Sequence, residues 1–251
     1  MPEFFKKFLF LTVGLLAGQS AGAQLPDTLY RGRLILKVAP LSAAFDPHQT
    51  YQLGVEYFVS QRWSVQQEIG YGRYGLFLHA NNGLADRGQQ VWRYRAEGRK
   101  YRPARSDRLT GQPRAGRPYL AYEFLFKRVH LPQSQSVGRD CDSGMGCAYF
   151  EQIDYTNARD AYTLHFKFGK QYIWDRFVLD YYGGIGWRIL SIRNLNLPVD
   201  AQTNWLRGEE RGFWIANIRQ PGVYSLPSAC LGLKLGILCG KVPRQLRNNA
   251  W

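Results

Sequence analysis

Hydrophobic and polar side chains alternate residue by residue along much of this chain. Tyr51, Leu53, Val55 and Tyr57 share one parity, and polar or small residues occupy the positions between them. A period of two is typical of a β-strand that has one apolar and one polar face. Helical heptads are absent, so the pattern predicts an all-β protein.

Eight segments follow this pattern and are predicted to be strands. They span residues 33–40, 51–59, 63–72, 92–101, 118–127, 162–169, 176–189 and 229–239. The apolar parity of these segments holds one charged residue, Lys100. The polar parity holds fourteen: Arg33, Lys37, Glu56, Glu68, Arg93, Arg95, Glu97, Arg99, Glu123, Lys127, Lys167, Asp180, Arg188 and Lys234.

The apolar face could form the core of a soluble barrel or contact the lipid around an outer-membrane barrel. Glycine is frequent on the polar face, which suits a narrow, packed interior. Aromatic residues gather near strand ends on the apolar face, as in the aromatic girdles of membrane barrels. These residues are Tyr51, Trp63, Tyr71, Trp92, Tyr162, Phe177 and Trp187. Both features favour the membrane.

The connections between the predicted strands alternate in length. The first set spans 41–50, 73–91, 128–161 and 190–228, and the second spans 60–62, 102–117 and 170–175. Long outer loops and short periplasmic turns are typical of outer-membrane barrels, although 102–117 is longer than a tight turn. We therefore predict an eight-stranded antiparallel transmembrane β-barrel.

The N-terminus has the pattern of a secretory signal peptide. Lys6 and Lys7 precede the apolar run 8–17, and Ala21-Gly22-Ala23 follows. This order predicts cleavage after Ala23, with a membrane-anchoring helix as the alternative. We predict a signal peptide at 1–23, an outer-membrane barrel at 24–240 and a basic periplasmic tail at 241–251.

Several strand motifs carry a resemblance to a known family. They are RLILKVAPL (33–41), YQLGVEY (51–57), WSVQQEIGY (63–71), EGRKY (97–101), YLAYEFLFK (119–127), FGKQ (168–171) and FVLDYYGGIG (177–186). Over about residues 30–240 the chain resembles small Bacteroidota outer-membrane barrels described only as a domain of unknown function. The resemblance implies a barrel of OmpA or OmpX size with no assigned reaction. The tail is a departure, because Trp251 lies past Pro243 rather than at the close of the last strand.

The polar face predicts a charge network in the lumen, because side chains fill the interior of an eight-stranded barrel. Its predicted members are Lys37, Glu56, Glu68, Arg95, Glu97, Arg99, Glu123, Lys127, Lys167, Asp180 and Arg188. Unpaired charges there would cost several kcal/mol each, so we expect them to pair. Three interpretations stay open: a structural ion-pair plug, a narrow pore or ion path, and a catalytic carboxylate pair.

The four cysteines lead to two predictions. Cys141 and Cys147 lie in the third outer loop and are expected to form a disulfide in an oxidising compartment. Cys230 and Cys239 lie about 30 Å apart along one extended strand, so they cannot pair and are expected to be small apolar residues. No metal site is predicted, since the cysteine spacing lacks a second Cys or His pair. The acidic residues of the loop do not match an EF-hand: Asp140, Asp142, Glu151 and Asp154.

The chain carries no recognisable hydrolase, metalloprotease or nucleotide-binding motif, so no catalytic residue and no cofactor is predicted. His48, His79 and His130 fall in or near outer loops. A lipid-modifying enzyme with its site at the outer rim is therefore an alternative.

The composition adds a strong positive charge. The chain has 251 residues, with 33 Lys+Arg against 19 Asp+Glu, for a net charge of +14. The polar strand faces hold part of this excess, and the 102–117 connection and the tail hold another part. These two basic segments could contact peptidoglycan or a periplasmic partner. Secretion argues against nucleic acid as a partner, and the expected partners are the lipid bilayer, lipopolysaccharide and the barrel-assembly machinery.

We therefore expect a non-enzymatic outer-membrane barrel with a structural or surface-interaction role, acting through loops 73–91, 128–161 and 190–228. Three alternatives stay open: the lipid-modifying rim enzyme, a narrow pore, and a soluble secreted barrel that binds a ligand.

Overall fold

A computed structural model describes residues 32–44, 50–73, 88–102, 116–142, 146–197 and 221–240. Eight strands are present: β1 (Leu34–Val38), β2 (Tyr51–Phe58), β3 (Trp63–Arg73), β4 (Gln90–Tyr101), β5 (Arg117–Asp142), β6 (Gly146–Trp174), β7 (Phe177–Leu195) and β8 (Gly222–Cys239). The described residues confirm an antiparallel ring of eight strands. The predicted signal peptide, the tail with Trp251, His48, His79 and most of the basic 102–117 connection lie outside the described residues.

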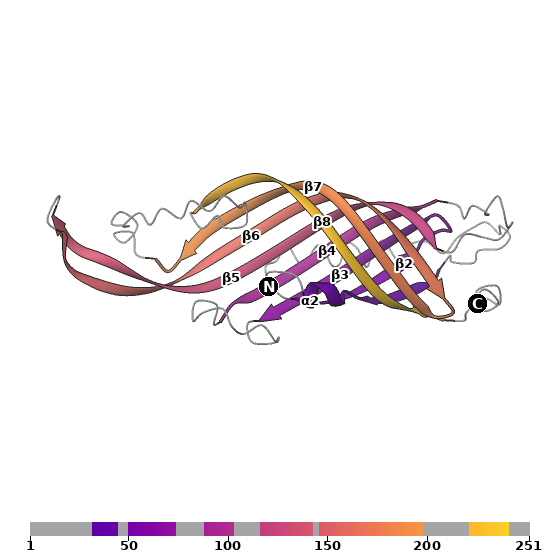
Figure 1. Cartoon of the computed structure of the whole chain (residues 1–251), viewed down its shortest axis with the longest axis horizontal. Coiled ribbons are helices and arrows are strands. Elements are labelled where there is room, and N and C mark those ends of the chain that lie inside the picture. The colour runs from indigo at the N-terminus through magenta and orange to yellow at the C-terminus, as the bar shows by residue number, and fades with distance from the viewer. Residues whose placement is uncertain are drawn as a thin grey trace.

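The eight strands form one antiparallel sheet that closes on itself in a hydrogen-bonded ring. Each strand pairs with its neighbours in sequence, and β8 pairs with β1 through registers such as Leu34↔Cys239 and Val38↔Leu235. The strands run obliquely around a common axis (Figure 1). Closure gives the sheet an inner and an outer face, and successive residues of a strand point to opposite faces.

The predicted parities correspond to these two faces. Along β2, exposed and buried side chains alternate, with Leu53 on the outside and Glu56 fully buried. On β6, too, the apolar side chain is exposed and the charged one is buried: Leu164 is 65% exposed and Lys167 is 0% exposed. The ring is therefore apolar outside and charged inside.

The prediction of a loop at 128–161 is wrong. β5 and β6 continue through this region as a hairpin, paired from Arg128↔Asp160 to Asp142↔Gly146. Figure 1 shows the hairpin projecting beyond the rest of the ring. In the described part of the outer hairpin, 131–142 and 146–155, apolar and polar residues do not alternate regularly, so the pattern that marks the other strands is missing there.

Other strands are also longer than predicted, so the connections between them are shorter. β7 runs to Leu195 and β8 starts at Gly222, so the 190–228 connection is shorter than predicted. The predicted turn at 170–175 is also wrong, because β6 continues to Trp174 and only Asp175 and Arg176 connect it to β7. Asp175 has a φ of 50°, a left-handed conformation that aspartate tolerates. The 60–62 turn lies between β2 and β3 as predicted.

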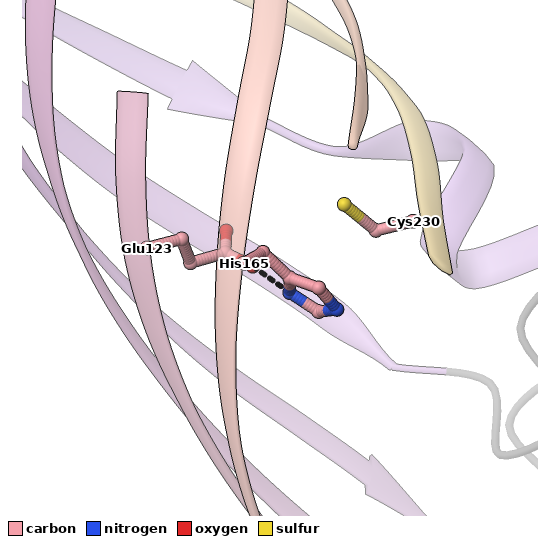
Figure 2. A group of neighbouring side chains, drawn as sticks. All are labelled: Glu123, His165 and Cys230. Carbon is pink, nitrogen blue, oxygen red and sulfur yellow. Dashed lines mark hydrogen bonds and ion pairs between the residues drawn. The ribbon is translucent and has the colours of Figure 1, made fainter. Parts of the chain in front are cut away.

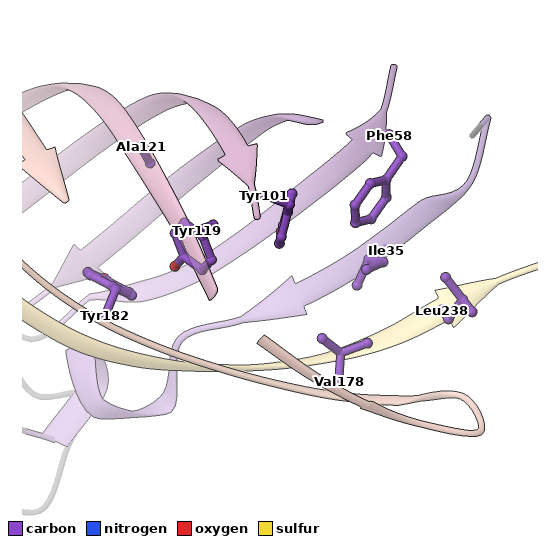
Figure 3. Packing of buried hydrophobic residues seen from close by; sticks show 8 residues of the cluster. All are labelled: Ile35, Phe58, Tyr101, Tyr119, Ala121, Val178, Tyr182 and Leu238. Atoms are coloured by element: carbon purple, nitrogen blue, oxygen red, sulfur yellow. The ribbon is translucent and has the colours of Figure 1, made fainter. Parts of the chain in front are cut away.

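An apolar cluster fills the inside of the ring at the end where these short turns lie (Figure 3). It contains Ile35, Phe58, Tyr101, Tyr119, Ala121, Val178, Tyr182 and Leu238. Ile35 and Phe58 are 0% exposed, and Tyr101 and Leu238 are 1% exposed. The prediction of a lumen lined by polar residues is therefore wrong at this end, where packing of apolar side chains excludes water.

One short helix, α2 (Pro40–Ala44), follows β1. It packs against β2 and β8, the two strands next to β1 in the ring. Among the residues that the structure describes, no helix is long and apolar enough to cross a membrane.

Candidate functional site

In the described part of the chain, eleven buried charged side chains lie on the inner face of the ring; one is Arg93, and the other ten form a group above the apolar cluster. Five are carboxylates: Glu56, Glu68, Glu97, Glu123 and Asp180. Five are cations: Lys37, Arg95, Arg99, Lys167 and Lys234. None is more than 7% exposed. We call these ten residues the charge network, and its formal charges cancel.

Asp180 is one centre of the charge network. Its carboxylate lies 2.7 Å from Lys37 Nζ and 2.7 Å from Arg99 Nη1. The Tyr119 hydroxyl, from the apolar cluster, donates a third hydrogen bond of 2.7 Å. This dense pairing offsets the desolvation of the charges, because a buried carboxylate needs both cations and donors.

Glu97 and Glu56 extend the network around the ring. Glu97 lies 2.7 Å from Arg99 Nε and 3.3 Å from Lys167 Nζ. Glu56 lies 2.6 Å from Lys37 Nζ and accepts a hydrogen bond of 2.6 Å from the Tyr101 hydroxyl. Each carboxylate therefore bridges cations on different strands, and the network ties the ring together across its interior.

Glycines on neighbouring strands make room for these long side chains. A Cβ built on Gly184 would lie 2.8 Å from Lys167 Cγ, and one built on Gly54 would lie 2.6 Å from Glu68 Cγ. Both distances are too short for a real contact. The charged side chains therefore lie across glycine backbone, which explains why glycine is frequent on the polar face.

A second feature of the inner face is a row of polar residues across four strands. Glu123 on β5 pairs in register with His165 on β6, His165 with Gly186 on β7, and Gly186 with Ser228 on β8. A Cβ on Gly186 would lie 2.7 Å from His165 Cδ2. The imidazole thus lies over Gly186 and reaches the serine two strands away.

Hydrogen bonds join the three side chains of this row. His165 Nδ1 lies 2.9 Å from Glu123 Oε1, and His165 Nε2 lies 3.0 Å from Ser228 Oγ. An ionised carboxylate only accepts, so the neutral imidazole donates from Nδ1 to Glu123. Nε2 then accepts the hydroxyl hydrogen of Ser228. Lys167 and Arg95 also contact Glu123, which keeps this carboxylate charged.

Cys230 lies beside this row (Figure 2). Its sulfur, a His165 nitrogen and a Glu123 oxygen all lie within 4.8 Å of one another, a grouping that could offer ligands to a metal ion. Two cations already contact Glu123, and both imidazole nitrogens have hydrogen-bond partners, so the arrangement is poor for a divalent cation. Cys230 packs against the apolar cluster, as expected from the sequence, and also lies close to the polar side chains of His165 and Glu123.

Cys230 and Cys239 are both free thiols, which confirms that they do not pair with each other. Cys141 and Cys147 lie opposite each other in the register of the hairpin. That placement suits a cross-strand disulfide, and the disulfide stays a prediction.

Nine of the eleven residues predicted for the lumen network lie in the charge network; the other two are Lys127 and Arg188. Both are half-buried on the inner face, toward the hairpin end. Lys234 contacts Glu68 and lies 3.5 Å from Glu97, so it joins the network although the prediction omitted it.

The sequence reasoning also missed the row itself. His165 has the inner parity of its strand, and that parity was a usable signal. Ser228 comes just before the predicted strand 229–239 and falls in the connection predicted at 190–228.

At the hairpin end, the outer face becomes polar. Asp160 lies 2.6 Å from Arg128 Nε and 2.9 Å from Arg193 Nη2. Its hydrogen bonds raise the pKa of Arg128, which keeps the guanidinium charged. These residues mark the edge of the apolar outer surface.

No protein-family model matches the chain, and neither a curated protein nor a solved structure matches it.

Proposed function

We propose that the chain is an integral outer-membrane β-barrel of the small Bacteroidota type, with a structural or surface-interaction role. One observation carries the proposal: the ring is apolar outside and charged inside. Leu231 is 87% exposed and Ile185 is 69% exposed, whereas Arg99 and Glu56 are 0% exposed. Large contiguous apolar surfaces are rare on proteins that face water on all sides. Lipid is the medium that such a surface fits.

The dimensions of the apolar surface support the same proposal. On β7 the outward apolar residues run from Phe177 to Ile189, a length of about 40 Å along the strand. At the tilt usual for such barrels this covers about 30 Å, close to the hydrocarbon thickness of a bilayer. It ends near the level of the charged Arg128 and Asp160.

Aromatic contacts lie at both ends of this surface. Toward the hairpin, Tyr71 packs on Trp92 with ring centroids 4.7 Å apart. At the turn end, Lys100 lies over the ring of Trp63, 5.2 Å from its centroid. Aromatic side chains with a polar neighbour suit the two lipid–water interfaces. This also gives a role to Lys100, the single charge of the apolar parity.

The interior favours a closed ring over a pore. Ion pairs join the members of the charge network, and the apolar cluster fills the turn end. A water path would need to cross both layers. We propose that the network acts as a structural plug that holds the strands together.

The surface role falls to the β5–β6 hairpin. Its end carries Tyr149 and Phe150, which are 56% and 59% exposed. We propose that Cys141 and Cys147 form a disulfide that fixes this end of the hairpin. A rigid ribbon with exposed aromatic side chains can contact other molecules at the cell surface.

Membrane fractionation tests the proposal. The full chain should remain in the outer-membrane fraction after carbonate washing and be released by detergent. Unheated samples should migrate faster on gels than boiled ones, because the folded barrel resists the detergent at room temperature. Release by carbonate or buffer alone would contradict the proposal and favour a soluble secreted barrel.

A further inference from the structure

We infer that Ser228, His165 and Glu123 form an acyl-transfer site on the inner face of the ring, with Ser228 as the nucleophile toward a carboxylic ester. The inference goes beyond the proposed structural role and holds whichever medium surrounds the outer face. It rests on the order and geometry of the three side chains. A serine, a histidine and a carboxylate in series form the arrangement that activates a hydroxyl in many hydrolases.

The hydrogen-bond distances fit this role. Both bonds of the series, 3.0 Å and 2.9 Å, lie within the range for a nucleophile, its base and the group that orients the base. Glu123 is 2% exposed and held by Lys167 and Arg95, so it stays ionised and fixes the imidazole tautomer. Glu123 is therefore placed to orient the imidazole toward Ser228.

The surroundings of Ser228 differ from those of the charge network. On the inner faces of β7 and β8 at the hairpin end, Gly186, Arg188, Leu226, Ser228 and Cys230 are all half-buried. Solvent therefore reaches the serine, while Lys167 and Asp180 are 0% exposed. A reactive serine needs this access, whereas a structural one does not.

Arg188 adds a positive charge next to the serine. It pairs in register with Leu226, two residues from Ser228 on the same inner face. Among the described residues, Arg188 Nε has no hydrogen-bond partner. The Nε atom itself is buried, so the contribution of Arg188 is its positive charge near the serine, which suits the negative charge that develops during attack or an anionic group on the substrate.

The reaction balances with water as the second substrate. Ser228 Oγ attacks the ester carbonyl carbon while its proton passes to His165 Nε2. The C–O bond to the alcohol then breaks, and the alcohol leaves with the proton from Nε2. His165 next removes a proton from water, the resulting hydroxide attacks the acyl-serine, and Ser228 regains its proton as the carboxylic acid leaves.

Labelling and hydrolysis test the assignment on the full chain in detergent micelles, with heat-modifiable migration as the folding check for every variant. The probes are a fluorophosphonate, located by peptide mass spectrometry, and p-nitrophenyl butyrate. We expect the label on Ser228 and ester hydrolysis above the buffer rate. Ser228→Ala and His165→Gln should each lower the rate by about 10³-fold or more. Ser225→Ala is the matched control, since this outward hydroxyl on the same strand contacts only Trp187 among the hydrogen bonds described.

Two outcomes would overturn the inference. The first is a folded parent protein that neither hydrolyses the ester nor takes the label. The second is hydrolysis that persists in folded Ser228→Ala. If that rate is lost in Cys230→Ala, the thiol is the nucleophile instead. Labelling of the parent protein needs no variant, so a variant that fails to fold leaves the test intact.

Discussion

β5 and β6 pass through two regions that share one pairing but differ in their side chains. In the part of the strands that belongs to the ring, Phe168 is 61% exposed on the outer face, whereas Glu123 is 2% exposed on the inner face. In the projecting hairpin the same strands stay paired, yet Phe150, Glu151 and Gln152 are exposed in succession. Backbone pairing continues across a boundary where the side-chain pattern ends.

The difference shows that alternation reports the surroundings of a strand more than the strand itself. In the ring, one face meets a packed charged interior and the other is an exposed apolar surface. In the hairpin, burial is confined to a small patch around Val137 and Ile153, so no continuous apolar face selects a period of two. The same kind of substitution should therefore have a much larger effect in the ring than in the hairpin.

The largest difference is expected for removal of a carboxylate. Asp180→Asn keeps the shape of the side chain but leaves Lys37 and Arg99 short of negative charge inside the ring. We expect the free energy of unfolding to fall by about 3–5 kcal/mol, measured by urea unfolding in phospholipid vesicles. Asp154→Asn in the hairpin is the matched control and should change it by less than about 0.5 kcal/mol. Equal losses in both variants would contradict the distinction between the regions.

A charge on the outer face of the ring should have the next largest effect. Leu231 is 87% exposed and lies opposite Gly183, midway along the apolar stretch of β7. In a bilayer, Leu231→Arg should cost about 2–4 kcal/mol of unfolding free energy. Phe150→Arg in the hairpin should be nearly neutral. If Leu231→Arg is neutral as well, the outer face is not in contact with lipid.

The glycine beneath His165 gives a smaller effect. A Cβ on Gly186 would lie 1.9 Å from the Leu164 carbonyl oxygen, so Gly186→Ala must shift backbone. We expect a loss of about 1–3 kcal/mol in the same unfolding assay. Gly98→Ala is the matched control, because nothing lies within 4 Å of a Cβ there. A loss as large for Gly98→Ala would show that strand glycines matter for another reason.

Shortening the hairpin should have the smallest effect. Residues 135–153 can be replaced by Asn-Gly, so that a two-residue turn joins the register pair Ser134 and Asp154. The deletion removes the small contact of Val137 and Ile153 with Leu197. We expect heat-modifiable migration to persist and the unfolding free energy to change by about 1 kcal/mol or less. Loss of the folded band would show that the ring depends on the hairpin.

The parts of the fold that the sequence predicted are those where the two faces differ. All eight strands and the outward position of residues such as Leu53 and Leu164 followed from parity alone. The length of β5 and β6 did not, because the hairpin carries no alternation. The apolar cluster was also missed, since Ile35 and Leu238 have the parity of the charged face.

Some residues of the candidate site could also be predicted from parity, whereas others could not. Inner charges such as Glu56 and Asp180 could be found by counting, because each lies on the polar parity of a clear strand. The contact between His165 and Ser228 depends on register across three strands, and on the missing side chain of Gly186 between them. The register between distant segments is set when the ring closes, so it cannot be predicted from the sequence of any single strand.

The pairing of β1 with β8, which closes the ring, has a consequence for how the protein folds. β1 contributes five pairs to β2 and five to β8, whereas β5 and β6 share twenty-five. Its partner β8 is the last strand of the ring in sequence, so closure must wait until all eight strands are available. Contacts between such distant segments form slowly, and two strand edges stay unpaired meanwhile. The β1–β8 junction is thus the expected last step of assembly and the first place for the folded ring to open.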